Sequence, residues 1–117
     1  MALEIEHKFL LVSDDWRSEV DHSMRFQQGY LGGCALNSIR VRISDTQAWL
    51  NVKSASIGDH RLEFEYEIPL ADAQVMLKQL CHQPQIDKIR HFVNRGSHVW
   101  EIDEFLGDNQ GLIVAEI

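Results

Sequence analysis

Cysteine, proline and basic residues are scarce in this sequence of 117 residues, which has two cysteines, two prolines and eleven Lys or Arg against eighteen Asp or Glu. Cys34 and Cys81 form no CxxC pair, which argues against a disulfide framework or a cysteine-based zinc site and favours a reducing cytoplasm. The formal net charge of −7 argues against general nucleic-acid binding. No apolar run approaches the roughly 20 residues of a membrane helix, and no basic segment opens a signal peptide, so no membrane partner is expected.

The length corresponds to about one domain of roughly 100–150 residues. Apolar residues make up 44% of the chain, and three Trp and five Phe are spread through it, which excludes intrinsic disorder. No linker, low-complexity stretch or internal repeat interrupts the sequence. We therefore expect residues 1–117 to form a single domain.

Alternation of apolar and polar residues predicts about eight strands, over 3–12, 24–31, 38–43, 48–53, 61–68, 86–94, 98–105 and 112–117. A short helix is predicted over 14–20, with Ser13 as its N-cap. The clearest helix is predicted over 71–82, with an apolar stripe of Val75, Met76, Leu77 and Leu80. Short turns between consecutive strands indicate an α+β fold with a mostly antiparallel sheet, which can close as a barrel.

Charged residues gather on one face of nearly every predicted strand, because residues two apart on a strand share a face. Seven of the eleven bases lie on this pattern; the acids and bases on it are Glu4, Glu6, Lys8, Arg40, Arg42, Lys53, Arg61, Glu63, Glu65, Glu67, Lys88, Arg90, Glu101, Asp103 and Glu116. One interpretation is the solvated face that antiparallel sheets commonly have. The other is a face that points into a barrel.

An inward charged face would need water, metal and a charged ligand, because uncompensated buried charge is very costly. Carboxylate oxygens suit Mg²⁺ or Mn²⁺, and Arg and Lys suit phosphate oxygens. Acids for a metal beside bases for phosphates are the usual equipment of metal-assisted phosphoryl transfer.

A series of short motifs runs along the chain in a fixed order. The chain opens with Glu4-x-Glu6-x-Lys8, followed by Gln28-Gly29-Tyr30-Leu31, Arg40-x-Arg42 and Leu50-Asn51-Val52-Lys53. The acidic strand Glu63-Phe64-Glu65-Tyr66-Glu67 precedes the helix, and Lys88-x-Arg90, Trp100-Glu101-Ile102-Asp103 and the segment ending at Glu116 complete the series. In this order the motifs resemble those of the CYTH superfamily, the triphosphate tunnel metalloenzymes. A lone ExExK would be weak, whereas seven further motifs in the same order over essentially the whole chain are specific.

The resemblance implies an eight-stranded antiparallel β tunnel, a closed barrel with one main flanking helix, that hydrolyses a triphosphate with Mg²⁺ or Mn²⁺. By position, the metal would be held by Glu4, Glu6, Glu63, Glu65, Asp103 and Glu116, and the substrate by Lys8, Arg40, Arg42, Lys53, Arg61, Lys88 and Arg90. Glu6, Glu65 and Lys8 would be catalytic.

Within that family the resemblance favours hydrolysis of inorganic tripolyphosphate to pyrophosphate and phosphate. A class IV-type adenylyl cyclase and a non-catalytic triphosphate- or polyphosphate-binding module are the alternatives. The family's last acidic strand usually reads Glu-x-Glu, and this sequence stops one residue after Glu116, so we expect a domain truncated at its C-terminus. The expected partner is a small-molecule triphosphate, and a homodimer stays open.

Overall fold

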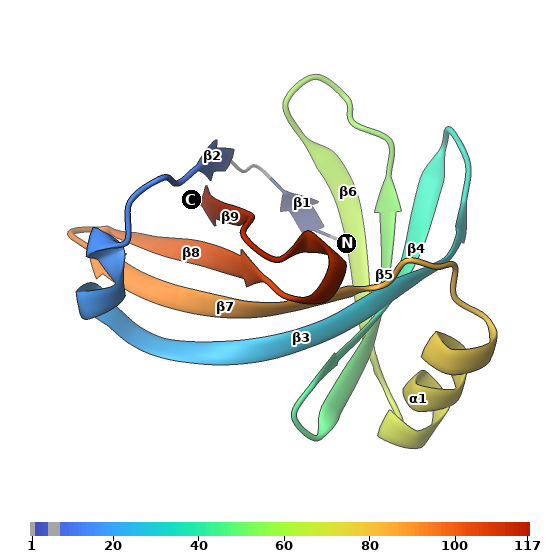
Figure 1. The fold of residues 1–117 in the computed structure, drawn as a ribbon. Coiled ribbons are helices and arrows are strands. Elements are labelled where there is room, and N and C mark those ends of the chain that lie inside the picture. The colour runs from blue at the N-terminus through green and yellow to red at the C-terminus, as the bar shows by residue number, and fades with distance from the viewer. Residues whose placement is uncertain (1, 5–7) are drawn as a thin grey trace. The chain divides into compact units, whose positions relative to one another are not determined.

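The computed structural model describes the backbone of residues 2–4 and 8–117 and the side chains from residue 9 onward. The chain divides into two units, and Figure 1 labels their elements. Unit 1 comprises β1 (Ala2–Glu4) and Gln27–Gln85, and unit 2 comprises the stretch from β2 (Lys8–Leu10) to Phe26 together with Ile86–Ile117. The long strand β3 (Val20–Gly33) contributes its first part to unit 2 and its second part to unit 1.

Unit 1 is built on an antiparallel sheet with the strand order β1-β6-β5-β4-β3, in which the further strands are β4 (Asn37–Ser44), β5 (Gln47–Ser54) and β6 (Arg61–Ile68). Its hairpin from β4 to β5 turns at Asp45, which has a φ of 54°, a conformation that Asp tolerates. The alternation of β4 buries Val41 and Ile43 on one face. Arg40 and Arg42 consequently lie on the other face.

Helix α1 (Leu70–Gln79) packs on the apolar face of this sheet. Ala73 and Leu77, four residues apart on one side of the helix, are buried in one cluster with Val41, Ile43 and Ala48 of the strands. The helix begins close to the predicted position but ends at Gln79, because the N–H groups of Leu80 and Cys81 both donate to the Met76 carbonyl and close the last turn.

The predicted apolar stripe of the helix is wrong at two positions, since Val75 is 51% and Leu80 61% exposed. The small side chain of Ala73 lets the helix approach the sheet, and this selects the face on which Leu77 lies. Leu77 of the helix and Cys81, which follows the helix, also pack closely against Gly29 of β3. A Cβ built on it would lie 3.0 Å from the Cβ of Cys81 and 3.2 Å from Cδ2 of Leu77.

Unit 2 is built on an antiparallel sheet with the order β3-β7-β8-β9-β2, in which the further strands are β7 (Ile86–Arg95), β8 (His98–Phe105) and β9 (Ile113–Glu116). Gly96, with a φ of 59°, makes the turn between β7 and β8. Two 3₁₀ helices, η1 (Asp15–Glu19) and η2 (Gly107–Asn109), complete the unit. Its core consists of Trp16, Val93, Ile102 and Ala115.

The predicted short helix near residue 15 is present as η1. Its N-cap is Asp14 rather than Ser13, although the Ser13 hydroxyl accepts a hydrogen bond of 3.1 Å from the N–H of Asp15. The strand predicted from Met24 begins earlier, at Val20. The first predicted strand, over 3–12, is described as the two short segments β1 and β2.

The antiparallel sheet with one main α-helix confirms the predicted α+β fold. Barrel closure and the single domain over 1–117 stay predictions. Both cysteines are free thiols, as expected. Among the described residues, no helix has the length and apolar character needed to cross a membrane.

Candidate functional site

The charged face of unit 1 consists of rows of paired residues that run across β4, β5 and β6. In one row Arg40 pairs with Asn51, which pairs with Glu65. In the next row Lys53 pairs with Glu63. The strand register therefore places cations of β4 and β5 beside carboxylates of β6 on one face, as the alternation predicted.

Asn51 lies at the centre of this face and has no exposed surface. Its Nδ2 donates to Oε2 of Glu65 at 2.7 Å and to Oε1 of Glu63 at 3.2 Å. Its Oδ1 is buried and has no hydrogen-bond partner among the described residues. Two carboxylates thus converge on one buried amide group.

The cations of this face are partly buried, unlike those of an ordinary solvated sheet face. The Lys53 side chain is only 15% exposed, and its Nζ lies 4.0 Å from Oε1 of Glu63. Arg42 donates from Nε to Oε1 of Gln28 at 3.0 Å. Nε of Arg40 is buried without a hydrogen-bond partner within the described part of the chain. Arginine donors held in this way are suited to oxygens of an anionic ligand.

Unit 2 carries the second charged face, and its centre is a buried group of three residues. Nζ of Lys88 lies 2.7 Å from Oδ2 of Asp103, and Arg90 donates from Nε to Oδ1 at 2.8 Å and from its terminal nitrogen to Oδ2 at 3.0 Å. The side chains of Lys88, Arg90 and Asp103 are 7%, 12% and 3% exposed. A second terminal nitrogen of Arg90 lies 3.1 Å from Oε2 of Glu101.

These contacts set the charge state of the group. Burial alone would raise the pKa of Asp103, but the hydrogen bond from Arg90 and the charge of Lys88 lower that pKa below its ordinary value. Burial would likewise lower the pKa of Arg90, whereas Asp103, Glu101 and Glu116 raise it. The aspartate is therefore an anion between two cations.

A further row in unit 2 connects the sequence-predicted residues of β8, β9 and β2. Glu101 pairs with Glu116, and Glu116 pairs with Lys8 in the backbone register. The side chains of Glu4 and Lys8 and the whole of Glu6 lie outside the described residues. Arg61 is partly buried, and its backbone pairs with that of Glu4 on β1.

The described residues fit a divalent metal in part. Glu63 and Glu65 present hard oxygens side by side at Asn51, whose own Oδ1 is a third oxygen without a hydrogen-bond partner among residues 9–117. No three His, Cys, Asp or Glu side chains gather into a metal-sized group within the described residues. Glu4 and Glu6, the other predicted metal ligands of the N-terminal segment, lie outside the described side chains.

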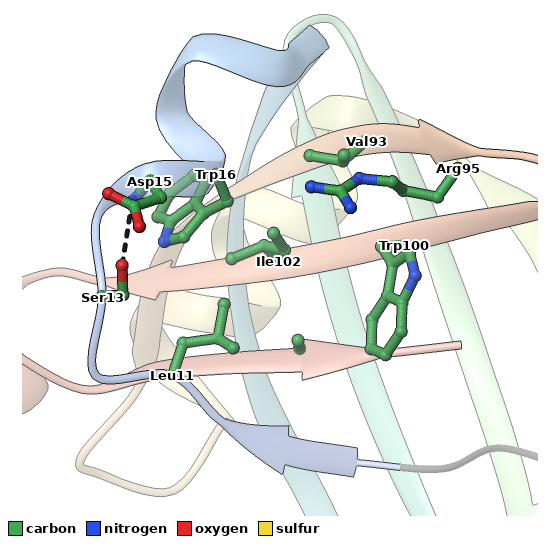
Figure 2. A pocket seen from close by; sticks show the side chains of 9 residues that line it. Leu11, Ser13, Asp15, Trp16, Val93, Arg95, Trp100 and Ile102 are labelled. Carbon is green, nitrogen blue, oxygen red and sulfur yellow. Dashed lines mark hydrogen bonds between the residues drawn. The ribbon is translucent and has the colours of Figure 1, made fainter.

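An apolar pocket of about 390 Å³ lies in unit 2, and Figure 2 shows its lining. Most of its lining is apolar, with Val93, Trp100 and Ile102 on the sheet face opposite Arg90 and Asp103, and Ser13, Asp15 and Arg95 are the polar residues that border it. Nε1 of Trp16 has no hydrogen-bond partner among the described residues. A lining of this kind is unsuited to a highly charged ligand, so the candidate site is the charged face and not this pocket.

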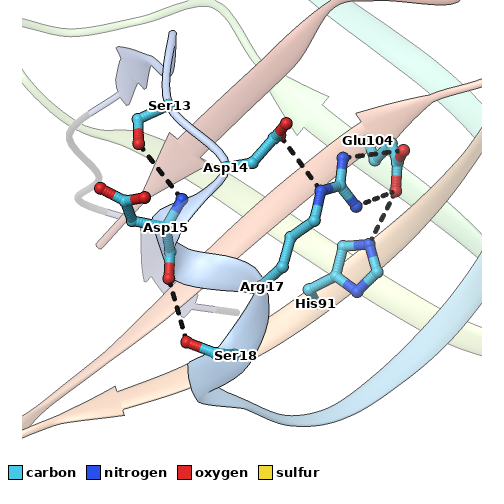
Figure 3. A network of polar contacts seen from close by, with 7 residues as sticks. All are labelled: Ser13, Asp14, Asp15, Arg17, Ser18, His91 and Glu104. Carbon is cyan, nitrogen blue, oxygen red and sulfur yellow. Dashed lines mark hydrogen bonds and ion pairs between the residues drawn. The ribbon is translucent and has the colours of Figure 1, made fainter.

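A polar network in Figure 3 joins η1 to β7 and β8. Arg17 donates two hydrogen bonds of 3.2 Å to the carboxylate of Glu104, and Nε2 of His91 lies 3.0 Å from the same group. The hydrogen bond from Arg17, followed by that from His91, lowers the pKa of Glu104. His91 and Glu104 lie on the sheet face opposite Arg90 and Asp103, so this network attaches η1 to the sheet.

Sequence reasoning gave no role to two neutral residues of the charged face, Gln28 and Asn51. Both are buried, and each makes a hydrogen bond to a predicted site residue. The sequence does indicate the side of the sheet on which Asn51 lies, because Asn51 is two residues before Lys53 and therefore shares its face.

Comparison with known proteins identifies a family that matches this chain. The sequence profile of the CYTH domain matches residues 2–116. An inorganic triphosphatase from Acetivibrio thermocellus is 42% identical over 117 residues, which cover 100% of this chain and 74% of that protein.

Solved structures agree with this match. The crystal structure of an inorganic triphosphatase superposes with a TM-score of 0.67 at 25% identity, over 97% of this chain and 73% of the other. A Hippeastrum adenylyl cyclase candidate with a dominant triphosphatase activity gives a TM-score of 0.66 at 12% identity, over 99% and 78% of the two chains, which shows a common fold. Since the profile spans nearly the whole chain and the motifs stand in the family's order, this chain belongs to the CYTH domain family.

Proposed function

We propose that this protein is a metal-dependent triphosphatase that hydrolyses inorganic tripolyphosphate to pyrophosphate and phosphate. The observation that carries the proposal is the burial of ion pairs on the charged face of each unit, Lys53 with Glu63 and Lys88 with Asp103, on a chain 42% identical to an inorganic triphosphatase. A partly buried face of mixed charge lowers the energy of a polyanion and its counter-cation together. A fully solvated sheet face would stabilise neither the polyanion nor the cation in this way.

The cations bind the phosphate chain in this proposal; they are Lys8, Arg40, Arg42, Lys53, Arg61, Lys88 and Arg90. The buried Nε of Arg40 supports this role, because a phosphate oxygen would satisfy it. Gln28 holds Arg42 through its Nε, which leaves the terminal nitrogens of the guanidinium in a defined orientation.

The carboxylates bind the metal in this proposal; they are Glu4, Glu6, Glu63, Glu65, Asp103 and Glu116. Bound Mg²⁺ or Mn²⁺ would polarise the phosphoryl oxygens and lower the charge of the transition state. Glu6, Glu65 and Lys8 are the proposed catalytic residues, of which a carboxylate would orient or deprotonate the attacking water and Lys8 would neutralise phosphate charge.

The closed β tunnel belongs to the same proposal. Its support is the family membership together with the N-terminal strands, since β1 pairs with β6 and β2 pairs with β9. A single domain over 1–117, a homodimer and a cytoplasmic location are also proposed, the last supported by the two free thiols.

The test is to incubate the protein separately with tripolyphosphate and ATP, with Mg²⁺ or Mn²⁺, and to resolve the products. We expect orthophosphate and pyrophosphate from tripolyphosphate, at rates above those with ATP. Glu65→Gln should abolish turnover and retain the fold. Cyclic AMP with stoichiometric pyrophosphate from ATP would instead identify a cyclase, and phosphate binding without turnover at any metal concentration would identify a binding module.

A further inference from the structure

Asn51 is a buried amide between a strand that carries cations and a strand that carries acids. It is 0% exposed, and its register neighbours are Arg40 on β4 and Glu65 on β6. Buried strand positions usually take Val or Ile, because a buried polar atom without a partner loses its hydration with no compensation. An amide at this position therefore needs polar partners to offset its burial.

Its partners are two carboxylates. Nδ2 donates to Oε2 of Glu65 at 2.7 Å and to Oε1 of Glu63 at 3.2 Å, so both protons of the amide nitrogen are used. Oδ1 has no partner among residues 9–117, and the reversed amide would place that oxygen against two carboxylates. All the hydrogen bonds that the described residues give the Asn51 side chain are thus made to Glu63 and Glu65.

Asn51 links Glu63, which also lies beside Lys53, to its neighbour Glu65. The two glutamates lie two residues apart on one face of β6, where their like charges repel each other. A neutral donor between them reduces the repulsion and restricts both side chains to one arrangement, so the carboxylate oxygens are oriented before a cation arrives.

We propose that Asn51 is a positioning residue of the metal site, which orients Glu63 and Glu65 for a divalent cation. The inference rests on the proposed function for the identity of these carboxylates as metal ligands. Removing a group that orients metal ligands weakens metal binding about 10–100-fold, so Asn51→Ala should weaken Mn²⁺ binding at least about tenfold. A purely structural amide would change stability and leave the Mn²⁺ affinity of the folded protein unchanged.

The experiment titrates Mn²⁺ into metal-free protein without substrate and follows free Mn²⁺ by electron paramagnetic resonance. Asn51→Ala removes both hydrogen bonds, and Asn51→Thr keeps one hydroxyl donor on a residue that suits a strand. Gln28→Ala is the matched control, because it removes another buried amide of unit 1 that contacts the cation Arg42 instead of a carboxylate. Circular dichroism establishes that each variant is folded.

The expected order of Mn²⁺ affinity is wild type and Gln28→Ala within about twofold of each other, Asn51→Thr intermediate, and Asn51→Ala weakest. Mn²⁺ affinities of Asn51→Thr and Asn51→Ala within twofold of wild type would overturn the inference. An equal loss in Gln28→Ala would also overturn it, because the loss would then follow from general packing. If Asn51→Ala does not fold, the Asn51→Thr variant decides.

Tripolyphosphate hydrolysis is measured on the same wild-type sample to separate the two proposals. An active wild type whose Mn²⁺ affinity is independent of Asn51 overturns the positioning role alone. A wild type whose Mn²⁺ affinity depends on Asn51 but which hydrolyses no tripolyphosphate supports the positioning role and overturns the proposed function.

Discussion

Replacing Asp103 by Asn removes the only carboxylate that contacts both Lys88 and Arg90 among the described residues of unit 2. The three side chains are nearly buried, so Lys88 and Arg90 would lose the anion between them where little water can screen their charges, although Arg90 keeps its contact with Glu101. Asparagine has almost the same shape as aspartate and can still accept a hydrogen bond. The variant therefore changes charge with little change in packing.

Removing one partner of a buried ion pair costs about 3–5 kcal/mol, and the retained acceptor places Asp103→Asn near the lower limit. For a domain of this size 1 kcal/mol corresponds to about 4 °C in melting temperature, so we expect a decrease of about 12 °C. Tripolyphosphate supplies negative charge to the same two cations. It should therefore raise the melting temperature of Asp103→Asn by more than that of the wild type.

The assay is thermal unfolding followed by circular dichroism at pH 7.5, with and without tripolyphosphate. Asp108→Asn is the matched control, because it removes the same charge from an exposed residue and should change stability by no more than about 0.5 kcal/mol. A melting temperature of Asp103→Asn within about 3 °C of wild type would refute the reasoning. An equal tripolyphosphate shift in both proteins would show that Lys88 and Arg90 do not meet the ligand.

Arg42→Ala should weaken tripolyphosphate binding by about 2 kcal/mol or more. Arg42→Lys should restore only part of this binding energy, because an ammonium group cannot replace the paired donors of a guanidinium. An unchanged KM in both variants would place Arg42 outside the site. Gly29→Ala should lower stability by about 1–3 kcal/mol in a chemical denaturation experiment, since its Cβ would be overpacked, whereas Gly32→Ala, whose Cβ would meet nothing within 4 Å, is the control. Glu104→Gln should be less stable than wild type at neutral pH, because the hydrogen bond from Arg17 lowers the pKa of Glu104 in the folded protein. The stability that this carboxylate contributes is present above its pKa in the unfolded chain and is lost as the pH falls through its pKa in the folded protein. Melting temperatures between pH 7 and pH 3 should therefore converge at low pH, and a constant difference would contradict this explanation.

The strands of this protein could be predicted because their side chains alternate strictly. The predicted bounds of 61–68 and 98–105 coincide with β6 and β8. The end of α1 could not be predicted, since it depends on two N–H groups that share the Met76 carbonyl. The stripe predicted for α1 is right at Leu77 and Met76 and wrong at Val75 and Leu80, because the small Ala73 lies on the buried side and a sequence pattern gives more weight to Val75.

For the candidate site, the sequence placed the charged residues on one face, but it could not pair them. Pairing depends on register between strands, and the register of β7 and β8 is what brings Arg90 opposite Asp103. Neutral residues of the site are harder to predict from the sequence than charged ones. Asn51 carries no charge, so only its burial and its two carboxylate partners reveal its position in the site.

The pairing of the N-terminal strands has a consequence for the order of folding. β4, β5 and β6 follow one another through short connections, as do β7 and β8, so these hairpins close small loops and can form early. Lys8, in contrast, pairs with Glu116 near the other end of the chain. Because the ribosome makes the N-terminus first, the strand that contains Lys8 must wait unpaired until Glu116 has been synthesised. We therefore expect β2 to join its sheet last, after β1 has paired with β6, and a chaperone that binds nascent apolar strands to contact Phe9 and Leu10 during that interval.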